Sequence, residues 1–226
     1  NRTDLPINNA GHGIIVLNSS QTVSVGTLGE EPNIISNNAL NGIEIVNSTN
    51  TSVFNNYIGT DVAGTANVGN TLNGVHIGGG NTGVTIDGNI IKGNTIDGIL
   101  IDENVAGTTV IGDNGTSGNG SRILSNGRHG VNVTTGTTTN LTITSNGIGV
   151  EVGNATTDGN VGNGINISNF SGTALLQGNI IGGNEYGIEL DVATGVTVNG
   201  NFIGTDAALS TVDIKNDIDG VRIVNG

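Results

Sequence analysis

An asparagine precedes almost every Gly-[Ile/Val]-x-[Ile/Val/Leu] tetrad of this chain at the same distance. In seven of the eight tetrads it lies four residues before the glycine, and in the eighth, at Gly187, Asn184 lies one residue closer. A polar residue that keeps phase with an apolar strand along a whole chain indicates one unit repeated many times. Stacked units would align these asparagines in a ladder, each amide bonding to the neighbouring coils. The seven are Asn9, Asn38, Asn70, Asn94, Asn126, Asn160 and Asn216.

The repeating unit is a coil of 23 to 34 residues, the distances from Gly164 to Gly187 and from Gly130 to Gly164. Its apolar runs are short, β-branched and of period two, and the chain has 40 glycines. These features disfavour helices and predict three strands of about three to five residues in each coil. We therefore predict an all-β parallel β-helix, a solenoid of about seven coils, with residues 1–226 forming one domain.

A second asparagine phase precedes the third strand of each coil, in the pattern Asn-x-Ile. Asparagine tolerates the left-handed turn conformation, and a buried amide needs a hydrogen-bond partner. These residues should therefore form a second ladder, which only Ser121 is expected to break. Its predicted members are Asn33, Asn56, Asn89, Asn146, Asn179 and Asn201.

The longer coils carry insertions at two recurrent places, after the third strand or between the second and third strands. Insertions that share a corner should line up along one side, which is where solenoids usually make their contacts. The first group spans residues 60–73, 149–163 and 205–219, and the second spans 26–32 and 112–121.

The composition limits the classes of partner and of metal site that the chain can have. Asp and Glu number 19 against 6 Lys and Arg, and the net charge of −13 disfavours nucleic acid and anionic membranes as partners. No apolar run approaches the ~20 residues of a membrane helix. The lack of cysteine excludes disulfides and thiolate metal sites. The chain begins at Asn1 and has no signal peptide, so we expect a processed form or an excerpt.

The spacing and the ladders resemble the right-handed parallel β-helix of the pectin-lyase-like superfamily over essentially the whole chain. Residues 56–61 (Asn-Tyr-Ile-Gly-Thr-Asp), with Gly64, 69–70 and 73–75, are similar to a repeat common in large bacterial surface proteins. Residues 201–206 are its second copy. The superfamily includes lyases, hydrolases, epimerases, phage tailspikes and adhesins, so function must be argued from a site.

Polygalacturonase-like members use Gly-His-Gly, with paired aspartates before it and an Arg-Ile-Lys-like segment after it. Residues 11–13 match the first element around His12, but no paired aspartates precede it. Val224 follows Arg222-Ile223 where a lysine is needed. Because His12 occupies the position before a tetrad glycine, we interpret it as structural.

Lyase-like members need a basic residue beside clustered carboxylates, and no basic residue here falls at a position that we can assign to such a cluster. The outward positions of the first strands instead predict ion pairs between neighbouring coils, Glu44 with His76 and Glu189 with Arg222. Exposed pairs of this kind contribute about 0–1 kcal/mol, and a catalytic Glu44–His76 pair is the alternative. The basic residues considered are Arg2, Lys92, Arg122, Arg128, Lys215 and Arg222. The outward row of the first strands, from coil to coil, is Ile15, Glu44, His76, Leu100, Asn132, Asn166, Glu189 and Arg222.

Loop carboxylates are the candidates for binding Ca²⁺, which needs six to eight oxygen ligands. Asp61 and Asp206 occupy equivalent places in the two copies of the surface-protein repeat. The chain has no EF-hand or RTX-type nonapeptide, and turn formation explains these aspartates better. We therefore expect no cofactor, with Ca²⁺ as the alternative. The further loop acids are Asp102, Glu103, Asp113 and Asp158.

We interpret the chain as a non-enzymatic extracellular or cell-surface protein, a segment of an adhesin or a head-to-tail fibre subunit. A carbohydrate-active or carbohydrate-binding β-helix is the alternative. Residues 5–12 match the third strand at 34–41 and the chain closes on the first strand at 221–223, so both ends fall inside a coil. Expected partners are identical subunits or flanking coils at both ends, with surface glycans as a further class, and neither nucleic acid nor membrane insertion. The few aromatic residues available for sugar stacking are Phe54, Tyr57, Phe170, Tyr186 and Phe202.

Overall fold

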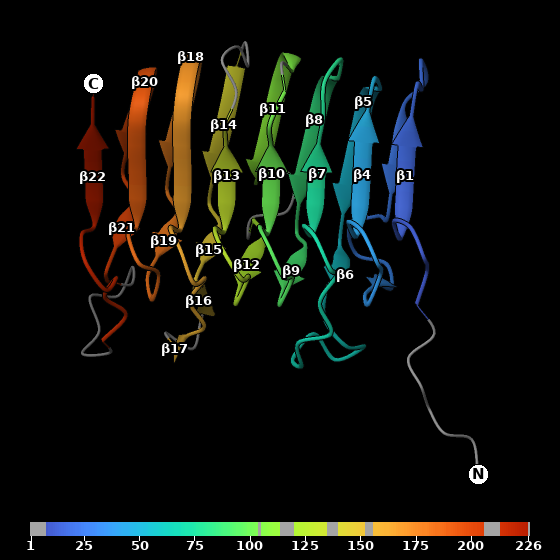
Figure 1. Cartoon of the computed structure of the whole chain (residues 1–226), viewed down its shortest axis with the longest axis horizontal. Helices are drawn as coiled ribbons and strands as arrows, with labels where there is room; N and C mark the ends of the chain where they lie inside the picture. The colour runs from blue at the N-terminus through green and yellow to red at the C-terminus, as the bar shows by residue number, and fades with distance from the viewer. Residues whose placement is uncertain are drawn as a thin grey trace.

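The fold is a stack of parallel strands with three strands in each coil, nearly closed into a solenoid (Figure 1). The computed structural model describes residues 8–103, 105–113, 120–134, 140–151, 156–205 and 213–225, and these contain strands and no helix. The third strands of successive coils form a seven-stranded sheet, so the stack has seven coils. The predicted all-β parallel β-helix is confirmed.

Strands at the same position of successive coils pair in parallel. The first strands are β1 (Ile14–Leu17), β4 (Ile43–Val46), β7 (Val75–Ile77), β10 (Ile99–Ile101), β13 (Val131–Val133) and β22 (Val221–Val224). The second strands are β2 (Val23–Val25), β5 (Thr49–Phe54), β8 (Thr82–Asp87), β11 (Ala106–Gly112) and β14 (Asn140–Thr144). The third strands are β3 (Asn33–Ile35), β6 (Asn56–Ile58), β9 (Ile90–Lys92), β12 (Arg122–Leu124), β15 (Gly147–Ile148), β19 (Ile180–Ile181) and β21 (Phe202–Ile203).

Two strands are much longer than the three to five residues predicted from the sequence. β18 (Ile165–Gln177) and β20 (Ile188–Asn199) each run through the first and second strand positions without a break. The corner between those positions is made by one residue with positive φ, which is Asn18, Asn47 or Asn169 in three of the coils. In β18 and β20 the residues on both sides of this corner stay paired, Ser168 with Asp191 and Phe170 with Ala193, so no loop separates the two segments.

Val192 occupies this corner in β20 with a φ of 50°. A β-branched side chain in the left-handed region is strained by about 1–2 kcal/mol, and asparagine tolerates that region better. We expect Val192→Asn to raise the free energy of unfolding by about 1 kcal/mol, measured by urea denaturation. Val161→Asn, at an exposed apolar residue whose φ is not positive, is the control and should change little. An unchanged or lowered stability of Val192→Asn would contradict the strain.

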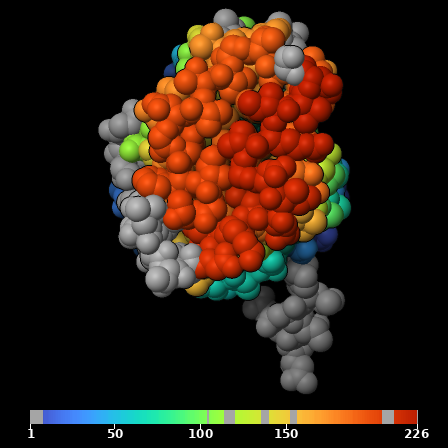
Figure 2. Space-filling model, turned by 90° about the vertical axis from the view of Figure 1, so that its left-hand side faces the viewer, coloured from blue at the N-terminus to red at the C-terminus, as the bar shows by residue number. Residues whose placement is uncertain are grey.

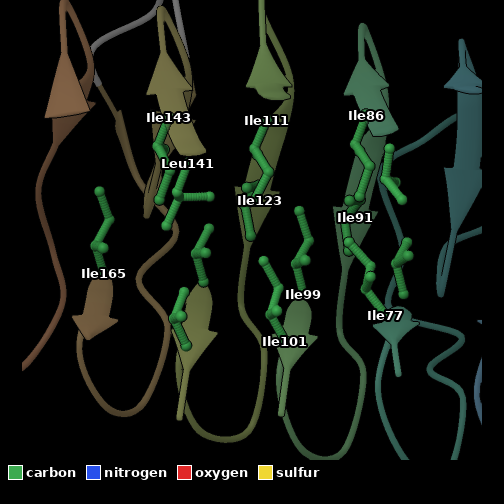
Figure 3. Packing of buried hydrophobic residues seen from close by; sticks show 14 of the residues in the cluster. Ile77, Ile86, Ile91, Ile99, Ile101, Ile111, Ile123, Leu141, Ile143 and Ile165 are labelled. Atoms are coloured by element: carbon green, nitrogen blue, oxygen red, sulfur yellow. The ribbon is translucent and has the colours of Figure 1, made fainter. Parts of the chain in front are cut away.

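The interior is filled by Ile, Val and Leu from all three strand positions, as Figure 3 shows for the middle coils. Inward residues of one phase lie in register, as Val75, Ile99 and Val131 do across β7, β10 and β13. All three are fully buried. Full burial of such a side chain stabilises a fold by about 1.5–3 kcal/mol, so the aligned apolar phase is the main source of stability.

The asparagines at four residues before the tetrad glycines form the first ladder, as predicted. At one rung, Asn94 Oδ1 accepts bonds from Asn70 N (3.2 Å) and Nδ2 (2.8 Å). Asn94 N and Nδ2 then donate to Asn126 Oδ1 at 3.1 and 3.0 Å. Asn184, outside the predicted set, adds one rung: it accepts from Asn160 and donates to Asn216. The first ladder is therefore Asn9, Asn38, Asn70, Asn94, Asn126, Asn160, Asn184 and Asn216.

The second ladder is also present, and the expectation that Ser121 breaks it is wrong. Asn89 N donates to Ser121 Oγ at 3.2 Å, and Ser121 N donates to Asn146 Oδ1 at 3.0 Å. The hydroxyl thus replaces the acceptor of an asparagine, and only the amide donor is lost. The remaining rungs join Asn33 to Asn56, Asn56 to Asn89, Asn146 to Asn179 and Asn179 to Asn201.

Insertions after the third strand project from the same edge of the stack (Figure 1). After β6, a loop closes through a bridge between Thr60 and Asn67. After β15, β16 (Val150–Glu151) and β17 (Thr156–Thr157) form an antiparallel hairpin. The common side predicted from the sequence is therefore seen for these two coils.

Candidate functional site

Three ion pairs lie on the outer surface of the first strands or at the corner just before them, a region here called the charged face: Glu44 with His76, Glu189 with Arg222, and Asp97 with Arg128. The predicted outward row is in register: Glu44 lies beside His76, His76 beside Leu100, and Glu189 beside Arg222. Outward positions on a parallel strand alternate with buried ones. The repeat therefore places one side chain of each coil in a continuous line along this face.

His76 lies between two carboxylates on the charged face. Its Nδ1 is 2.9 Å from both Glu44 oxygens, and its Nε2 is 2.8 Å from Asp102 Oδ1. Glu44 also accepts a bond from Asn41 Nδ2 at 2.6 Å. The Glu44 contact was predicted from the sequence, whereas Asp102 was considered only as a loop acid.

Two carboxylate partners keep the His76 imidazole protonated on both nitrogens. Burial alone would lower its pKa, but hydrogen bonds and charge from Glu44 and Asp102 raise the pKa to about 9. Burial also opposes ionisation of Glu44, yet the hydrogen bond and charge of His76, with a further bond from Asn41, lower the Glu44 pKa. A protonated imidazole with both N–H groups engaged has no free nitrogen with which to abstract a proton. The cluster therefore has the chemistry of an ion-pair clamp rather than of a catalytic base.

The clamp predicts a loss of stability at alkaline pH. The unfolded His76 deprotonates near its ordinary pKa of 6.5, whereas the folded one holds its proton to about pH 9. Its stabilisation is therefore complete below pH 6.5 and is lost as the pH rises through 9. Allowing for partial solvent screening, we expect about 2 kcal/mol less stability at about pH 10 than at about pH 6. Urea titrations should show this fall in the native chain and not in His76→Gln; equal falls in both would contradict the assignment.

A second cluster centres on Asp97, whose side chain is fully buried. Arg128 grips the carboxylate with Nε at 2.9 Å from Oδ1 and with Nη2 on Oδ2. Asn132 Nδ2 donates to Oδ2 at 2.9 Å, and the His129 backbone N–H donates to Oδ1 at 3.0 Å. Four donors satisfy the buried charge, as burial of a carboxylate requires.

Asp97 and His129 also belong to a third ladder that sequence reasoning missed. It uses the residue just before each tetrad glycine: Asn73 N donates to Asn41 Oδ1, and Asp97 N to Asn73 Oδ1. His129 N then donates to Asp97, and Asn163 N to His129 Nδ1 at 2.9 Å. His129 is thus an acceptor at Nδ1, and burial lowers its pKa. All members of this ladder lie one residue before a tetrad glycine, which could have revealed it in the sequence. The pattern was overlooked because the residue type at this position varies between coils.

Two further basic residues form ion pairs that were not predicted from the sequence. Lys92 Nζ, almost buried, contacts Asp158, which also accepts from Ser125 Oγ. Arg122 Nη1 lies 2.6 Å from Glu151 Oε2. Both carboxylates are carried by the insertion after β15. Each basic side chain forms an ion pair with one carboxylate, so neither is an unpaired base next to several acids.

The predicted Glu189–Arg222 pair is present at 2.9 Å between Oε1 and Nη1. Arg222 also lies over the Tyr186 ring, 4.9 Å from its centroid. Asn163 Nδ2 donates to the other Glu189 oxygen at 2.6 Å. Lys215 pairs with Asp213 at 3.0 Å, so every Lys and Arg in the described ranges contacts a carboxylate.

The loop acids considered for Ca²⁺ are dispersed and engaged within the protein. Asp61 Oδ1 accepts from the backbone N–H groups of Thr65 (2.8 Å) and Ala66 (3.1 Å), which lower its pKa. Glu103 accepts from the Gly79 N–H at 2.8 Å. Asp206 lies outside the described residues. Within those residues, no three His, Asp or Glu side chains are arranged to hold a metal ion.

His12 does not form the site that its Gly-His-Gly context suggests. Its Nδ1 lies 3.6 Å from Glu44 Oε2, beyond hydrogen-bonding distance, at the edge of the His76 clamp.

Comparison with protein-family models, curated proteins and solved structures found no match. Nothing in the part of the chain described forms a helix long and apolar enough to cross a membrane.

Proposed function

We propose that this chain is a non-enzymatic structural β-helix that works outside the cell or on its surface, as a segment of an adhesin or as a fibre subunit. One observation carries the proposal. On the charged face, His76 and the buried Asp97 are bonded to neighbouring groups of the protein instead of facing an open site. His76 has both nitrogens on carboxylates, and Asp97 has four donors of its own.

The ladders support a mechanical role. Each coil is joined to the next by parallel strand pairing and by side-chain bonds at two or three corners. Buried amide networks in which every member is satisfied make a structure rigid and unique. A net charge of −13 further suits a surface that must not bind nucleic acid or anionic lipid.

The proposal is tested by incubating the purified chain with pectate, alginate and neutral polysaccharides. We expect no release of reducing ends or unsaturated uronates, because His76 is held between two carboxylates and every Lys and Arg in the described residues is paired with an acid. Product release that is abolished by His76→Gln or His12→Ala, in variants that melt as folded proteins, would overturn the proposal. Binding to immobilised glycans without turnover would instead identify the adhesive form of the function.

A further inference from the structure

One rung of the third ladder depends on the protonation state of a histidine. The Asn163 N–H donates to His129 Nδ1 at 2.9 Å. A backbone N–H can only donate, so this bond exists only while Nδ1 carries no proton. The three preceding rungs use oxygen acceptors, on Asn41, Asn73 and Asp97. Of these four acceptors, His129 Nδ1 is therefore the one that a proton removes near neutral pH.

Burial keeps the His129 ring neutral. The charged groups that face the ring are Asp97 from the preceding coil, Arg128 from its own turn and Glu189 from β20. Burial is the largest influence and lowers the His129 pKa, Arg128 lowers it further, and the two carboxylates raise it without reversing the shift. Both carboxylates are already paired, Asp97 with Arg128 and Glu189 with Arg222. The ring can therefore act as an acceptor at neutral pH.

The His129 rung ties down residues 160–163, the arm that leads from the insertion after β15 into β18. Val161 N and Gly162 N also donate to backbone oxygens of the preceding coil, at 3.0 and 2.5 Å. Val161 is 72 % exposed, so few apolar contacts hold the arm in place. Gly162 packs closely on the imidazole, since a Cβ added there would lie 2.9 Å from Nδ1. A proton on Nδ1 would therefore set two donors against each other where the ring and the arm are in contact.

This rung lies inside the stack and not at one of its ends. It joins the coil of β13 to the coil of β18, whose strands pair from Val131–Ile165 to Val133–Ile167. β20 and β22 follow along the same sheet, and β22 forms part of the red surface in Figure 2. Strand pairing holds the two coils together without the rung, so we expect its loss to be confined to the arm.

We propose that His129 is an acid-sensitive latch. As the pH falls below neutrality, Nδ1 takes up a proton, the Asn163 N–H loses its acceptor, and residues 160–163 detach from the preceding coil. Detachment frees the backbone oxygens of Asn126 and Arg128, to which the arm donates. The strands on both sides stay paired. The inference goes beyond the proposed structural function and holds whether the chain is an adhesin segment, a fibre subunit or an enzyme.

The direction of the response follows from proton linkage. The His129 pKa is lowered from 6.5 in the folded chain, so the locally open chain binds a proton first as the pH falls. Closure of the arm is therefore unaffected above about pH 6.5 and weakens as the pH falls from there toward the folded pKa. His76 responds in the opposite sense, because its pKa is raised to about 9 and its clamp is lost at alkaline pH. The two histidines can thus be distinguished by the pH at which each acts.

Amide hydrogen exchange on the full chain tests the latch at about pH 7.5 and about pH 5, with each rate divided by the intrinsic rate at that pH. We expect the protection of the 161–163 amides to fall at least about tenfold at the lower pH, a change equivalent to about 1.4 kcal/mol. A single hydrogen bond is worth this much. The amides of Val75 and Ile99, in β7 and β10, should keep their protection. Unchanged protection at 161–163 would overturn the proposal.

His129→Asn is the matched variant, because asparagine is the native residue at this phase in Asn41, where Oδ1 accepts the N–H of the next coil. This variant should keep the arm protected at both pH values, since an amide oxygen stays an acceptor throughout this range. His76→Gln should open like the native chain. A loss of protection in His129→Asn as large as in the native chain would overturn the proposal.

A second measurement needs no variant. NMR titration of the native histidine rings should show a His129 midpoint below 6.5 and no proton on Nδ1 at neutral pH. A midpoint at or above 6.5, or a proton on Nδ1 at neutral pH, would also overturn the latch. Polysaccharide turnover bears on the non-enzymatic assignment alone, so the two proposals can fail separately.

Discussion

Replacing Asn94 with alanine is expected to lower the free energy of unfolding by about 3–4 kcal/mol. The backbone N–H and the side-chain amide of Asn70 would lose the oxygen to which they donate, and Asn126 Oδ1 would lose the hydrogen bond that it accepts from the Asn94 amide. Asn94 is itself 1 % exposed, so water cannot replace the lost acceptor. Urea or thermal denaturation of the purified variant measures the change.

Two variants at related sites sharpen this prediction. Asn140→Ala, at an exposed asparagine outside the ladders, should change stability by less than about 0.5 kcal/mol. Asn94→Ser should lie between the two, because Ser121 shows that a hydroxyl can hold the acceptor position of a rung. If Asn94→Ala lowers the free energy of unfolding by less than about 1 kcal/mol, strand pairing stabilises the fold and the asparagine ladder adds little to it.

The coils, the first ladder and the outward row could be predicted from their phase relative to the tetrad glycines. Residues at one distance from a tetrad glycine meet in successive coils, whatever the insertions between them, and this placed Glu44 beside His76 and Glu189 beside Arg222. The second ladder lies at varying distances from the tetrad glycines and could be predicted from its own Asn-x-Ile pattern instead. The third ladder has a constant phase, but that phase holds Asn41, Asp97 and His129 alike, so no repeated letter marks it.

Contacts made by loops could not be predicted in the same way. Asp102 reaches His76 from beyond the end of β10, and Asp158 reaches Lys92 from an insertion. Their positions depend on loop geometry that has no counterpart in neighbouring coils, so phase carries no information about them. Asn184 was missed for a related reason. It lies three residues before its tetrad glycine instead of four, so it fell outside the repeated pattern, although the backbone places it as a rung of the first ladder.

Removing the Arg128 guanidinium that pairs with Asp97 is expected to be the second large loss of folding stability. Arg128→Met keeps much of the side-chain volume but leaves a fully buried carboxylate without its cation. Breaking a buried pair costs about 3–5 kcal/mol, and we expect about 3 kcal/mol because the Arg128 side chain is 48 % exposed and partly screened. Urea denaturation at neutral pH provides the measurement.

The matched experiment is a double-mutant cycle with Asp97→Asn, since asparagine is the native residue at this phase in Asn41, Asn73 and Asn163. A neutral amide at position 97 can still accept the His129 N–H, as Asn41 accepts from Asn73. With the charge gone, adding Arg128→Met should cost less than about 1 kcal/mol, so the coupling between the two sites should be about 2 kcal/mol. If Arg128→Met costs the same in both backgrounds, the arginine stabilises the coil through its stem contacts and not through the buried carboxylate. That outcome would also weaken the charged face as a network of satisfied ion pairs, on which the non-enzymatic assignment depends.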